Sequence, residues 1–149
     1  MITINSHKGQ MLELKVSGEK FNQGVTFIKR KLLGRVYNPD TKFWEIPILK
    51  TNFELLKKEK TFEDADTIST FEDVDFATYL TATKEGDQIK IKFYYDDKII
   101  DIIKKKKEKD DKWDGDAGVW TVSEKTWKAV SQPISNYLKK LDEKFVINI

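Results

Sequence analysis

Apolar and polar residues alternate in two segments of the chain. Residues 11–16 read Met-Leu-Glu-Leu-Lys-Val, and residues 89–93 read Ile-Lys-Ile-Lys-Phe. A period of two places one set of side chains on each face of a strand. The pattern therefore predicts a half-buried β-strand in each half of the chain.

Apolar residues at helical spacing follow each of these segments. In the first half the stripe stops at Gly34, and glycine commonly ends a helix. In the second half Asp96 or Asp97 can serve as the N-cap. The stripe residues are Phe21, Val25, Ile28 and Leu32 in the first half and Ile99, Ile102 and Ile103 in the second. Each half is thus predicted to continue from strand into helix.

A turn between two short strands and a second helical stripe complete each half. The turn tracts are residues 38–41 and 114–118, which are rich in Asn, Asp, Gly and Pro. The second stripes are Leu49, Phe53 and Leu56, and Trp127, Val130, Ile134, Leu138 and Leu141. Pro133 lies inside the last stripe and predicts a kink or a break there. Residues 145–149 are apolar enough to close the chain as a strand.

The two halves resemble one another when the chain is shifted by 76 residues. Residues 37–47 then align with residues 113–123 without a gap, with aromatic on aromatic and turn on turn. Such internal repeats indicate a duplicated supersecondary unit. We therefore predict an α+β fold of two tandem β-α-β-β-α repeats, in which helices pack on small antiparallel sheets. The predicted repeats are residues 1–58 and 89–149.

Charge divides the chain into three blocks that the overall net charge of +2 conceals. Residues 1–58 contain eleven Lys or Arg against five Asp or Glu, and residues 89–149 contain fourteen against eleven. Residues 59–88 contain two against nine. Blocks of opposite sign indicate segments with different roles. We interpret residues 59–88 as an acidic connector between the repeats.

Composition narrows the function classes. The chain of 149 residues is 39% hydrophobic, which is enough for one ordinary domain or two very small ones. It has no cysteine and one histidine, His7, which excludes disulfides, thiolate sites and multi-histidine metal sites. No apolar run has bilayer length, and the N-terminus lacks signal-peptide features. We therefore expect a cytoplasmic protein without a membrane partner, and not an enzyme.

Residues 34–47, Gly-Arg-Val-Tyr-Asn-Pro-Asp-Thr-Lys-Phe-Trp-Glu-Ile-Pro, follow a Lys-rich helix and carry a family resemblance. The tract resembles HARP-type domains, which accompany annealing helicases, and the related N-terminal module of some phage helicases. The second half retains Trp113, Asp114, Asp116 and Trp120 of the pattern but has Gly118 and Ser123 where the first half has Lys42 and Pro47. The resemblance implies a module that binds DNA, often at junctions of single and double strand, without catalysis of its own.

Basic residues near each predicted hairpin support nucleic-acid binding independently of the resemblance. Lys and Arg provide most of the non-specific affinity for phosphates, and aromatic side chains stack on unpaired bases. The candidate nucleic-acid-binding residues are Lys29, Arg30, Lys31, Arg35, Tyr37, Lys42, Lys104, Lys105, Lys107, Lys112 and Trp113. A solvated Lys-rich face with packed aromatics is the alternative interpretation. The expected ligand is DNA rather than RNA.

Two hairpin registers are compatible with the sequence, and they differ in where Trp44 lies. A loop of residues 38–41 sets Tyr37 opposite Lys42 and Arg35 opposite Trp44, which gives a mixed stacking face. A loop one residue longer sets Val36 opposite Trp44. Since Ile46 shares a face with Trp44, and Val122 with Trp120, the core is the favoured place for both tryptophans.

No catalytic or metal-binding motif is complete. Asp40 and Glu45 are not followed by the lysine of metal-dependent nucleases, and residues 110–116 lack the spacing and closing Glu of a calcium loop. The phosphate loop of a helicase motor, G-x-x-x-x-G-K-[ST], is absent. We therefore expect no catalytic residues, no metal, no cofactor and no small-molecule substrate.

A second hypothesis is a small inhibitor or adaptor that binds a host protein, in the style of phage proteins that block host machinery. Its contact residues are in the acidic segment or on the basic faces. The candidates in the acidic segment are Phe62, Glu63, Asp64, Phe71, Glu72 and Asp73. The same carboxylates have an alternative role within the chain, against its own basic helices.

Overall fold

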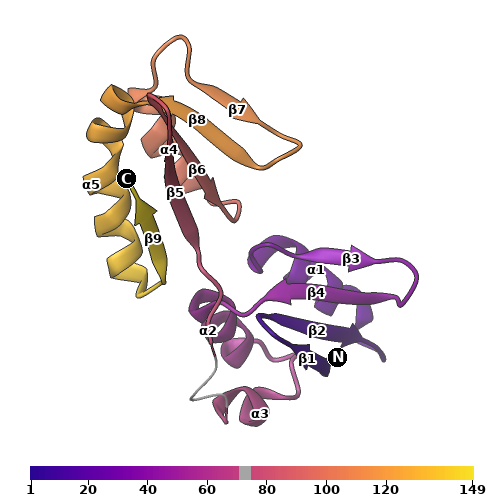
Figure 1. Ribbon diagram of the computed structural model, residues 1–149. Coiled ribbons are helices and arrows are strands. Elements are labelled where there is room, and N and C mark those ends of the chain that lie inside the picture. Colours follow the sequence, from indigo (N-terminus) through magenta and orange to yellow (C-terminus); the bar gives the residue numbers. More distant parts are fainter. Residues whose placement is uncertain (71–74) are drawn as a thin grey trace. The chain divides into compact units, whose positions relative to one another are not determined.

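Two β-sheets, each with helices packed on it, form the parts of the chain that the computed structural model describes, residues 1–70 and 75–149 (Figure 1). The chain divides into two compact units, residues 1–77 and 78–149, which we call unit 1 and unit 2. The fold is α+β, as predicted. The domain boundaries differ from the predicted ones.

Unit 1 has a four-stranded antiparallel sheet with the strand order β1-β2-β4-β3. Its elements are β1 (Ile2–Lys8), β2 (Met11–Val16), α1 (Phe21–Lys31), β3 (Val36–Asn38), β4 (Phe43–Pro47), α2 (Lys50–Lys58) and α3 (Ala65–Ser69). Leu12, Leu14 and Ile46 from the sheet and Ile28, Phe53 and Leu56 from the helices are buried together. A Cβ on Gly24 of α1 would come within 2.9 Å of the Val16 side chain, so glycine permits the close approach of helix and sheet.

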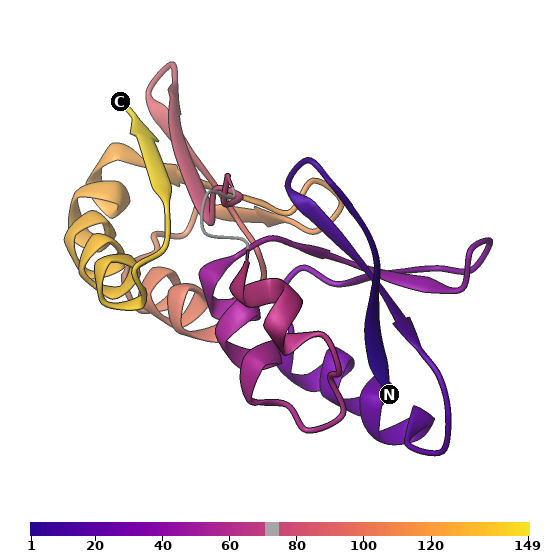
Figure 2. The ribbon, with the colours of Figure 1, turned by 90° about the horizontal axis from the view of Figure 1, so that it is seen from below.

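Unit 2 has a five-stranded sheet with the order β7-β8-β6-β5-β9, in which only the β5–β9 pair is parallel (Figure 2). Its elements are β5 (Leu80–Glu85), β6 (Gln88–Phe93), α4 (Asp97–Lys106), β7 (Lys112–Asp114), β8 (Val119–Ser123), α5 (Glu124–Leu141) and β9 (Phe145–Asn148). The helix α5 continues through Pro133, so the predicted break is absent. Burial of Trp127, Val130, Ile134 and Leu138 along one stripe stabilises the helix against the cost of the proline.

Each unit begins with a strand that the sequence analysis missed. Both units therefore start with the order β-β-α-β-β-α rather than β-α-β-β-α, and they continue with α3 in unit 1 and with β9 in unit 2. In β1 the register shifts between Ile4 and Ser6, and the bulge interrupts the alternation on which the prediction depends. In β5 only Leu80 and Ala82 are buried strand positions, and they lie inside the acidic segment. Neither strand therefore has a clear pattern of its own.

The segment 59–88 is divided between the two units rather than standing apart as a connector. Phe62 and Ile68 are buried in the core of unit 1. The Ile2 N–H donates to the Thr61 carbonyl at 2.6 Å, and the Glu63 N–H donates to the Ile2 carbonyl at 3.0 Å. Two apolar side chains and backbone pairing thus determine where this segment lies, whatever its net charge.

A buried carboxylate fixes the start of α4. Asp96 Oδ1 accepts from the N–H groups of Lys98 and Ile99, and Oδ2 accepts from the hydroxyls of Tyr79 and Tyr137 at 2.5 and 2.7 Å. Burial, and then the bond to Asp96, raise the pKa of both tyrosines well above the usual value. The N-cap predicted at Asp96 is confirmed, and it holds α4 against α5.

Candidate nucleic-acid interface

Three consecutive cations end the helix before the hairpin in both units. They are Lys29, Arg30 and Lys31 in α1 and Lys104, Lys105 and Lys106 in α4, and all six are exposed. The next residue caps each helix, with the Leu32 N–H donating to the Ile28 carbonyl and the Lys107 N–H to the Ile103 carbonyl. Positive charge at a helix C-terminus interacts favourably with the helix macrodipole, so these cations are compatible with a stable helix. We call these two sets the α1 cluster and the α4 cluster.

Buried polar side chains hold the loops that follow the clusters. In unit 1 the fully buried Asn52 accepts from the Leu33 N–H at 2.8 Å and donates to the carbonyls of Leu33 and Pro47. In unit 2 Asp111 accepts from the N–H groups of Glu108 and Ser123, at 2.7 and 2.8 Å, and from the Thr126 hydroxyl. Each cluster is therefore followed by a loop in a fixed conformation rather than by a loose linker.

The Asp111 carboxylate is held in its charged form. Burial is the largest single influence and opposes ionisation, but the bonds from Thr126, Glu108 and Ser123 and the charge of Lys107 together outweigh it. The pKa of Asp111 is consequently lower than that of an ordinary aspartate.

The turns of the two hairpins share the same hydrogen bonds. Asn38 Oδ1 accepts from the N–H groups of Asp40 and Thr41, and Asp114 Oδ1 accepts from those of Asp116 and Ala117. A backbone bond closes each turn, from Lys42 to Asn38 at 2.7 Å and from Gly118 to Asp114 at 2.8 Å. The closing residue has a positive φ in both, 64° at Lys42 and 67° at Gly118.

The hairpin register differs from both predicted alternatives. Tyr37 pairs with Trp44, because the loop comprises residues 39–42 and begins one residue later than expected. The equivalent pair in unit 2 is Trp113 with Trp120. Lys42 therefore lies in the turn, and neither Lys42 nor Arg35 pairs across the ladder as the first alternative required.

Each hairpin consequently carries an aromatic pair at one register position. The ring centroids lie 5.0 Å apart for Tyr37 and Trp44 and 5.7 Å apart for Trp113 and Trp120. The outer rings, Tyr37 and Trp113, are 44% and 45% exposed. Trp120 and Trp127 are buried, as predicted, while Trp44 is partly buried against the core. Both pairs are tilted, with interplanar angles of 55° and 43°, so each outer ring contacts the inner one and remains partly exposed.

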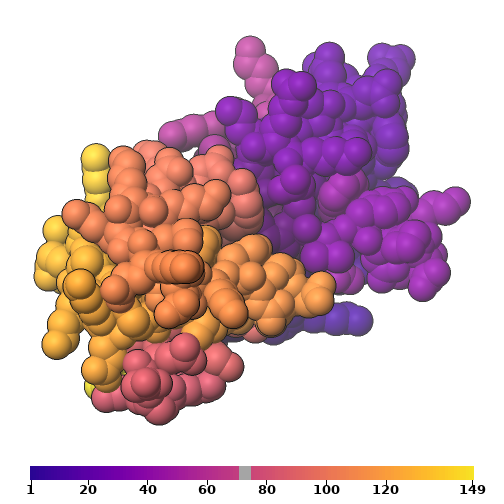
Figure 3. Space-filling model, turned by 90° about the horizontal axis from the view of Figure 1, so that it is seen from above, coloured from indigo at the N-terminus to yellow at the C-terminus, as the bar shows by residue number. Residues whose placement is uncertain are grey.

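All of the predicted nucleic-acid residues are exposed, and they fall on the same elements in both units. Lys107 caps α4, Lys112 lies on the edge strand β7, and Arg35 donates from Nη1 to the Leu32 carbonyl at 3.4 Å. Figure 3 shows the surface of the α4–β7 region of unit 2 (salmon to orange) on the face turned toward the viewer. The structure thus brings each set to a helix end and the hairpin that follows it.

The acidic candidates lie in different surroundings. The Phe62 side chain is buried in the core, so it is not presented to a partner. Asp64 Oδ2 accepts from the Ile4 N–H at 2.7 Å, which gives this carboxylate a role in anchoring β1. Glu63 is exposed. Phe71, Glu72 and Asp73 lie outside the described residues.

A surface depression of ≈ 630 Å³ beside hairpin β7–β8 was not foreseen from the sequence. We call it the β7–β8 depression; its lining includes Gln88, Asp110, Lys112, Trp113, Asp114 and Thr121. The sequence does contain one indication of it, the alternation along β8. Thr121 lies between the buried Trp120 and Val122, so its side chain points to the opposite face of the sheet.

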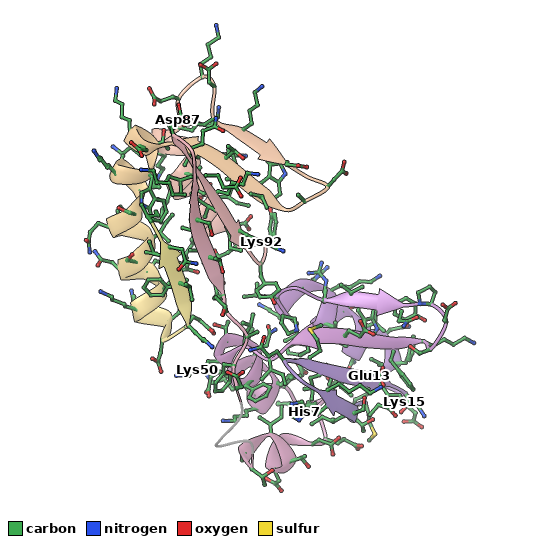
Figure 4. All side chains as sticks on the ribbon, in the orientation of Figure 1. His7, Glu13, Lys15, Lys50, Asp87 and Lys92 are labelled. Atoms are coloured by element: carbon green, nitrogen blue, oxygen red, sulfur yellow. The ribbon has the colours of Figure 1, made fainter. Side chains whose placement is uncertain are left out.

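In each sheet one face carries the buried core residues, and the other faces of the two sheets differ in charge. Glu13 lies opposite Glu45 in unit 1, whereas the corresponding pair in unit 2 is Lys90 and Thr121. Glu13 and Lys15 on β2 and Lys92 on β6 are labelled in Figure 4. Lys90 forms an ion pair with Glu85 at 2.9 Å. Neither of these faces is as uniformly basic as the helix ends.

Within residues 1–70 and 75–149, no three His, Asp or Glu side chains are grouped as metal ligands. His7, labelled in Figure 4, donates from Nε2 to the Gly9 carbonyl at 2.9 Å. None of the helices described combines the length and the hydrophobicity needed to cross a bilayer. Comparison with protein-family models, curated proteins and solved structures finds no match.

Proposed function

We propose that the protein is a non-enzymatic DNA-binding module whose two units contact the phosphate backbone through the α1 cluster, the α4 cluster and the adjoining hairpins. The observation that carries this proposal is the recurrence of three exposed cations at the same helix end in both units. The macrodipole favours cations at any helix C-terminus, and α2 and α5 each end in two lysines, but α1 and α4 share a run of three consecutive cations directly before a hairpin.

Local electrostatics support the clusters as phosphate sites. Residues 29–35 contain four cations and no carboxylate, and residues 104–107 are four consecutive lysines. Of the carboxylates that follow the second set, Asp111 is buried and directed into its loop, and Glu108 accepts from the Ser123 hydroxyl at 2.6 Å. Each phosphate that a Lys or Arg neutralises releases counterions, so such clusters bind DNA in a salt-dependent way. The resemblance of residues 34–47 to HARP-type domains adds DNA as the favoured polymer.

Fluorescence anisotropy with labelled duplex, single-stranded and forked DNA, at about 50 and 200 mM salt, tests the proposal. We expect binding that weakens steeply with salt. Replacing Lys29, Arg30 and Lys31 by alanine should weaken binding to all three ligands and lower the slope of log K against log salt by about 2–3.

A matched control removes the same charge elsewhere. Lys128, Lys139 and Lys140 are exposed on α5, and the last two end that helix as the α1 cluster ends α1. Their replacement by alanine should leave affinity and salt slope nearly unchanged. Equal losses in the two triple variants would show that net charge alone is responsible and would refute the assignment to the α1 cluster.

A further inference from the structure

A groove of ≈ 450 Å³ runs along the exposed flank of α1, and we call it the α1 groove. Its volume is within the range of roughly 300–1,000 Å³ found for ligand sites. Most of the lining comes from two adjacent rows of the helix, each with a spacing of four residues. The rows are Asn22, Thr26 and Arg30, and Gln23, Phe27 and Lys31, and Glu59 after α2 borders the groove. The groove therefore extends over about 12 Å of the helix, which rises about 1.5 Å per residue, and lies within unit 1.

In unit 2 the equivalent flank of α4 is covered by α5. The Thr126 hydroxyl, in the first half of α5, donates to Asp111 in the loop after α4. The Tyr137 hydroxyl, in the second half of α5, donates to Asp96 at the N-cap of α4. Because the two ends of α4 meet different halves of α5, the long helix runs back along α4.

In unit 1 the helix α2 begins in the same place but is too short to cover α1. Asn52, near its start, bonds to Leu33 in the loop after α1. The helix ends at Lys58 after nine residues, whereas α5 has eighteen. The second half of α5 therefore has no counterpart in α2, and the flank of α1 is left open.

The α1 groove corresponds to a place that an aromatic side chain fills in unit 2. Counted back from the three terminal cations, Gln23 of the groove corresponds to Lys98, and the Lys98 Nζ lies 5.6 Å from the centre of the Tyr137 ring on α5. Ile134 and Leu138, in the same half of α5, are buried. An apolar body is thus what this flank of the fold accommodates when it is covered.

The lining of the α1 groove combines apolar surface with two cations. It is largely apolar although Phe27 is its one apolar residue, so the aliphatic parts of the longer side chains contribute. Arg30 and Lys31 lie at one end, in the last turn of α1, and among the described residues neither of them forms an ion pair. Glu59 Oε1 accepts from the N–H and the hydroxyl of Thr61 at 3.3 and 3.1 Å, so this carboxylate is engaged with its own turn. Charge therefore favours an anionic group at the end of the groove where the cations lie.

A DNA backbone matches only part of this lining. Its phosphates can contact Arg30 and Lys31, as the proposed function requires, but they gain nothing from an apolar surface. A carboxylate on an apolar chain matches both parts. Its head forms charge-assisted hydrogen bonds with Arg and Lys, and each methylene that the groove buries strengthens binding by up to about fourfold.

We propose that the α1 groove binds a small amphipathic carboxylate, with its head on Arg30 and Lys31 and its apolar chain along Phe27 toward Asn22. This site goes beyond the proposed function. One consequence rests on that function: the head and a DNA phosphate use the same two cations, so the ligand should displace DNA from the α1 cluster.

Isothermal titration calorimetry of the full chain with acetate, butanoate, hexanoate, octanoate and decanoate tests the site. We expect the affinity to rise by up to about fourfold per added methylene and to level off at about ten carbons, when the chain becomes longer than the groove. Acetate should give no measurable heat of binding. Octanol should bind at least about tenfold more weakly than octanoate, because it lacks the charged head.

Lys29 provides a matched control, because it belongs to the α1 cluster but is not among the residues that line the groove. Arg30→Gln should weaken octanoate binding about tenfold, whereas Lys29→Gln should leave it nearly unchanged. Both variants should weaken DNA binding to a similar extent. Saturating octanoate should also lower the salt slope of DNA binding to the unaltered chain by about 2, since two cations are then occupied.

A pair of variants at Thr26 tests the groove without removing a cation. Thr26 is exposed on α1, and Glu and Gln are both good helix formers, so either replacement is compatible with the helix. Thr26→Glu should weaken octanoate binding more than Thr26→Gln, which has the same size but no charge to repel the carboxylate. Circular dichroism checks that each variant is folded.

The outcomes separate this site from the proposed function. Absence of heat with every carboxylate, affinity that does not depend on chain length, or equal losses of octanoate binding in Arg30→Gln and Lys29→Gln would overturn the site and leave DNA binding in place. Octanoate binding with the expected pattern, but without salt-dependent binding of any DNA, would overturn the proposed function and leave the α1 groove as a site for a small carboxylate.

Discussion

Lys42 is an unusual residue for its backbone conformation. It has φ of 64° in a turn whose hydrogen bonds match those of unit 2, where Gly118 holds the same position at 67°. A side chain in the left-handed region costs roughly 1–2 kcal/mol, and glycine avoids that cost. Lysine at this position is therefore unfavourable for folding and places a cation at the tip of the hairpin, where it can meet a phosphate.

Lys42→Gly should accordingly raise stability and lower affinity. We expect the free energy of unfolding of unit 1 to rise by about 0.5–1 kcal/mol, since relief of strain exceeds the added entropy of the unfolded chain. Affinity for DNA should fall, with a salt slope smaller by about 1. Denaturant unfolding and anisotropy measure the two effects.

Gly118→Lys makes the reverse change in unit 2. It should destabilise that unit by a similar amount and increase the salt slope. If Lys42→Gly improves stability without weakening binding, Lys42 is not a contact residue and its conformation has no functional explanation.

Asp111 makes the stability of unit 2 depend on pH. Because its pKa is lower in the folded chain than in the unfolded one, its contribution is complete above the unfolded value of about 4 and is lost as the pH falls through the folded value. Asp111→Asn should cost about 1–3 kcal/mol at neutral pH, because an amide cannot accept from three donors as the carboxylate does. Urea unfolding between about pH 7 and 3 should show a smaller acid-induced loss for Asp111→Asn than for the unaltered chain. Parallel curves for the two proteins would contradict this role.

Helices and strands with a strongly periodic pattern of apolar residues were predicted from the sequence, and strands without such a pattern were missed. The stripes of α1, α4 and α5 and the alternation of β2 and β6 follow from burial on one face. β1 has a bulge, and β5 has the small residue Ala82 at a buried position, so their patterns are weak. The hairpin register was missed by one residue because a lysine with positive φ closes the turn, and sequence gives no reason to expect it there.

The candidate interface was predictable in its cations but not in its polar lining. Runs such as residues 29–31 and 104–107 are visible without any fold. Gln88 and Thr121 are ordinary polar residues 33 positions apart, and only the neighbouring positions of β6 and β8 bring them together. The contact between the Trp113 and Trp120 rings similarly depends on a register that the sequence leaves open.

The α4 cluster should contribute to binding as the α1 cluster does. Lys104, Lys105 and Lys106 replaced by alanine should lower the salt slope by about 2–3, with a loss of helix stability within about 1 kcal/mol because the macrodipole favours these charges. Anisotropy over a salt series and thermal unfolding measure both effects. A normal slope in this variant, beside a reduced slope in the α1 variant, would confine phosphate contact to unit 1.

The molecule consists of two compact units that each start with the order β-β-α-β-β-α, followed by α3 in unit 1 and by β9 in unit 2. Phe62 bridges in parallel to Ile2 beside β1, and β9 runs parallel to β5. The correspondence between the two units thus extends to the edge of each sheet. Residues at corresponding register positions nevertheless differ, as with Lys42 and Gly118 or Glu45 and Thr121.

Two weak sites on one chain should bind a sufficiently long strand more tightly than either site alone. Linkage turns the second contact into an intramolecular step, and the gain can reach about 10²–10⁴-fold when both sites engage at once. We expect residues 1–77 and 78–149, made separately, each to fold, because each has its own sheet and buried core, and each to bind DNA with lower affinity and a smaller salt slope than the intact chain. Nuclear magnetic resonance spectra establish folding, and anisotropy with DNA of increasing length measures affinity. The advantage of the intact chain should appear only above a threshold length, since a ligand too short to reach both units gains nothing from linkage. An intact chain that binds every length no better than its stronger unit would show that the two units do not act together on one strand.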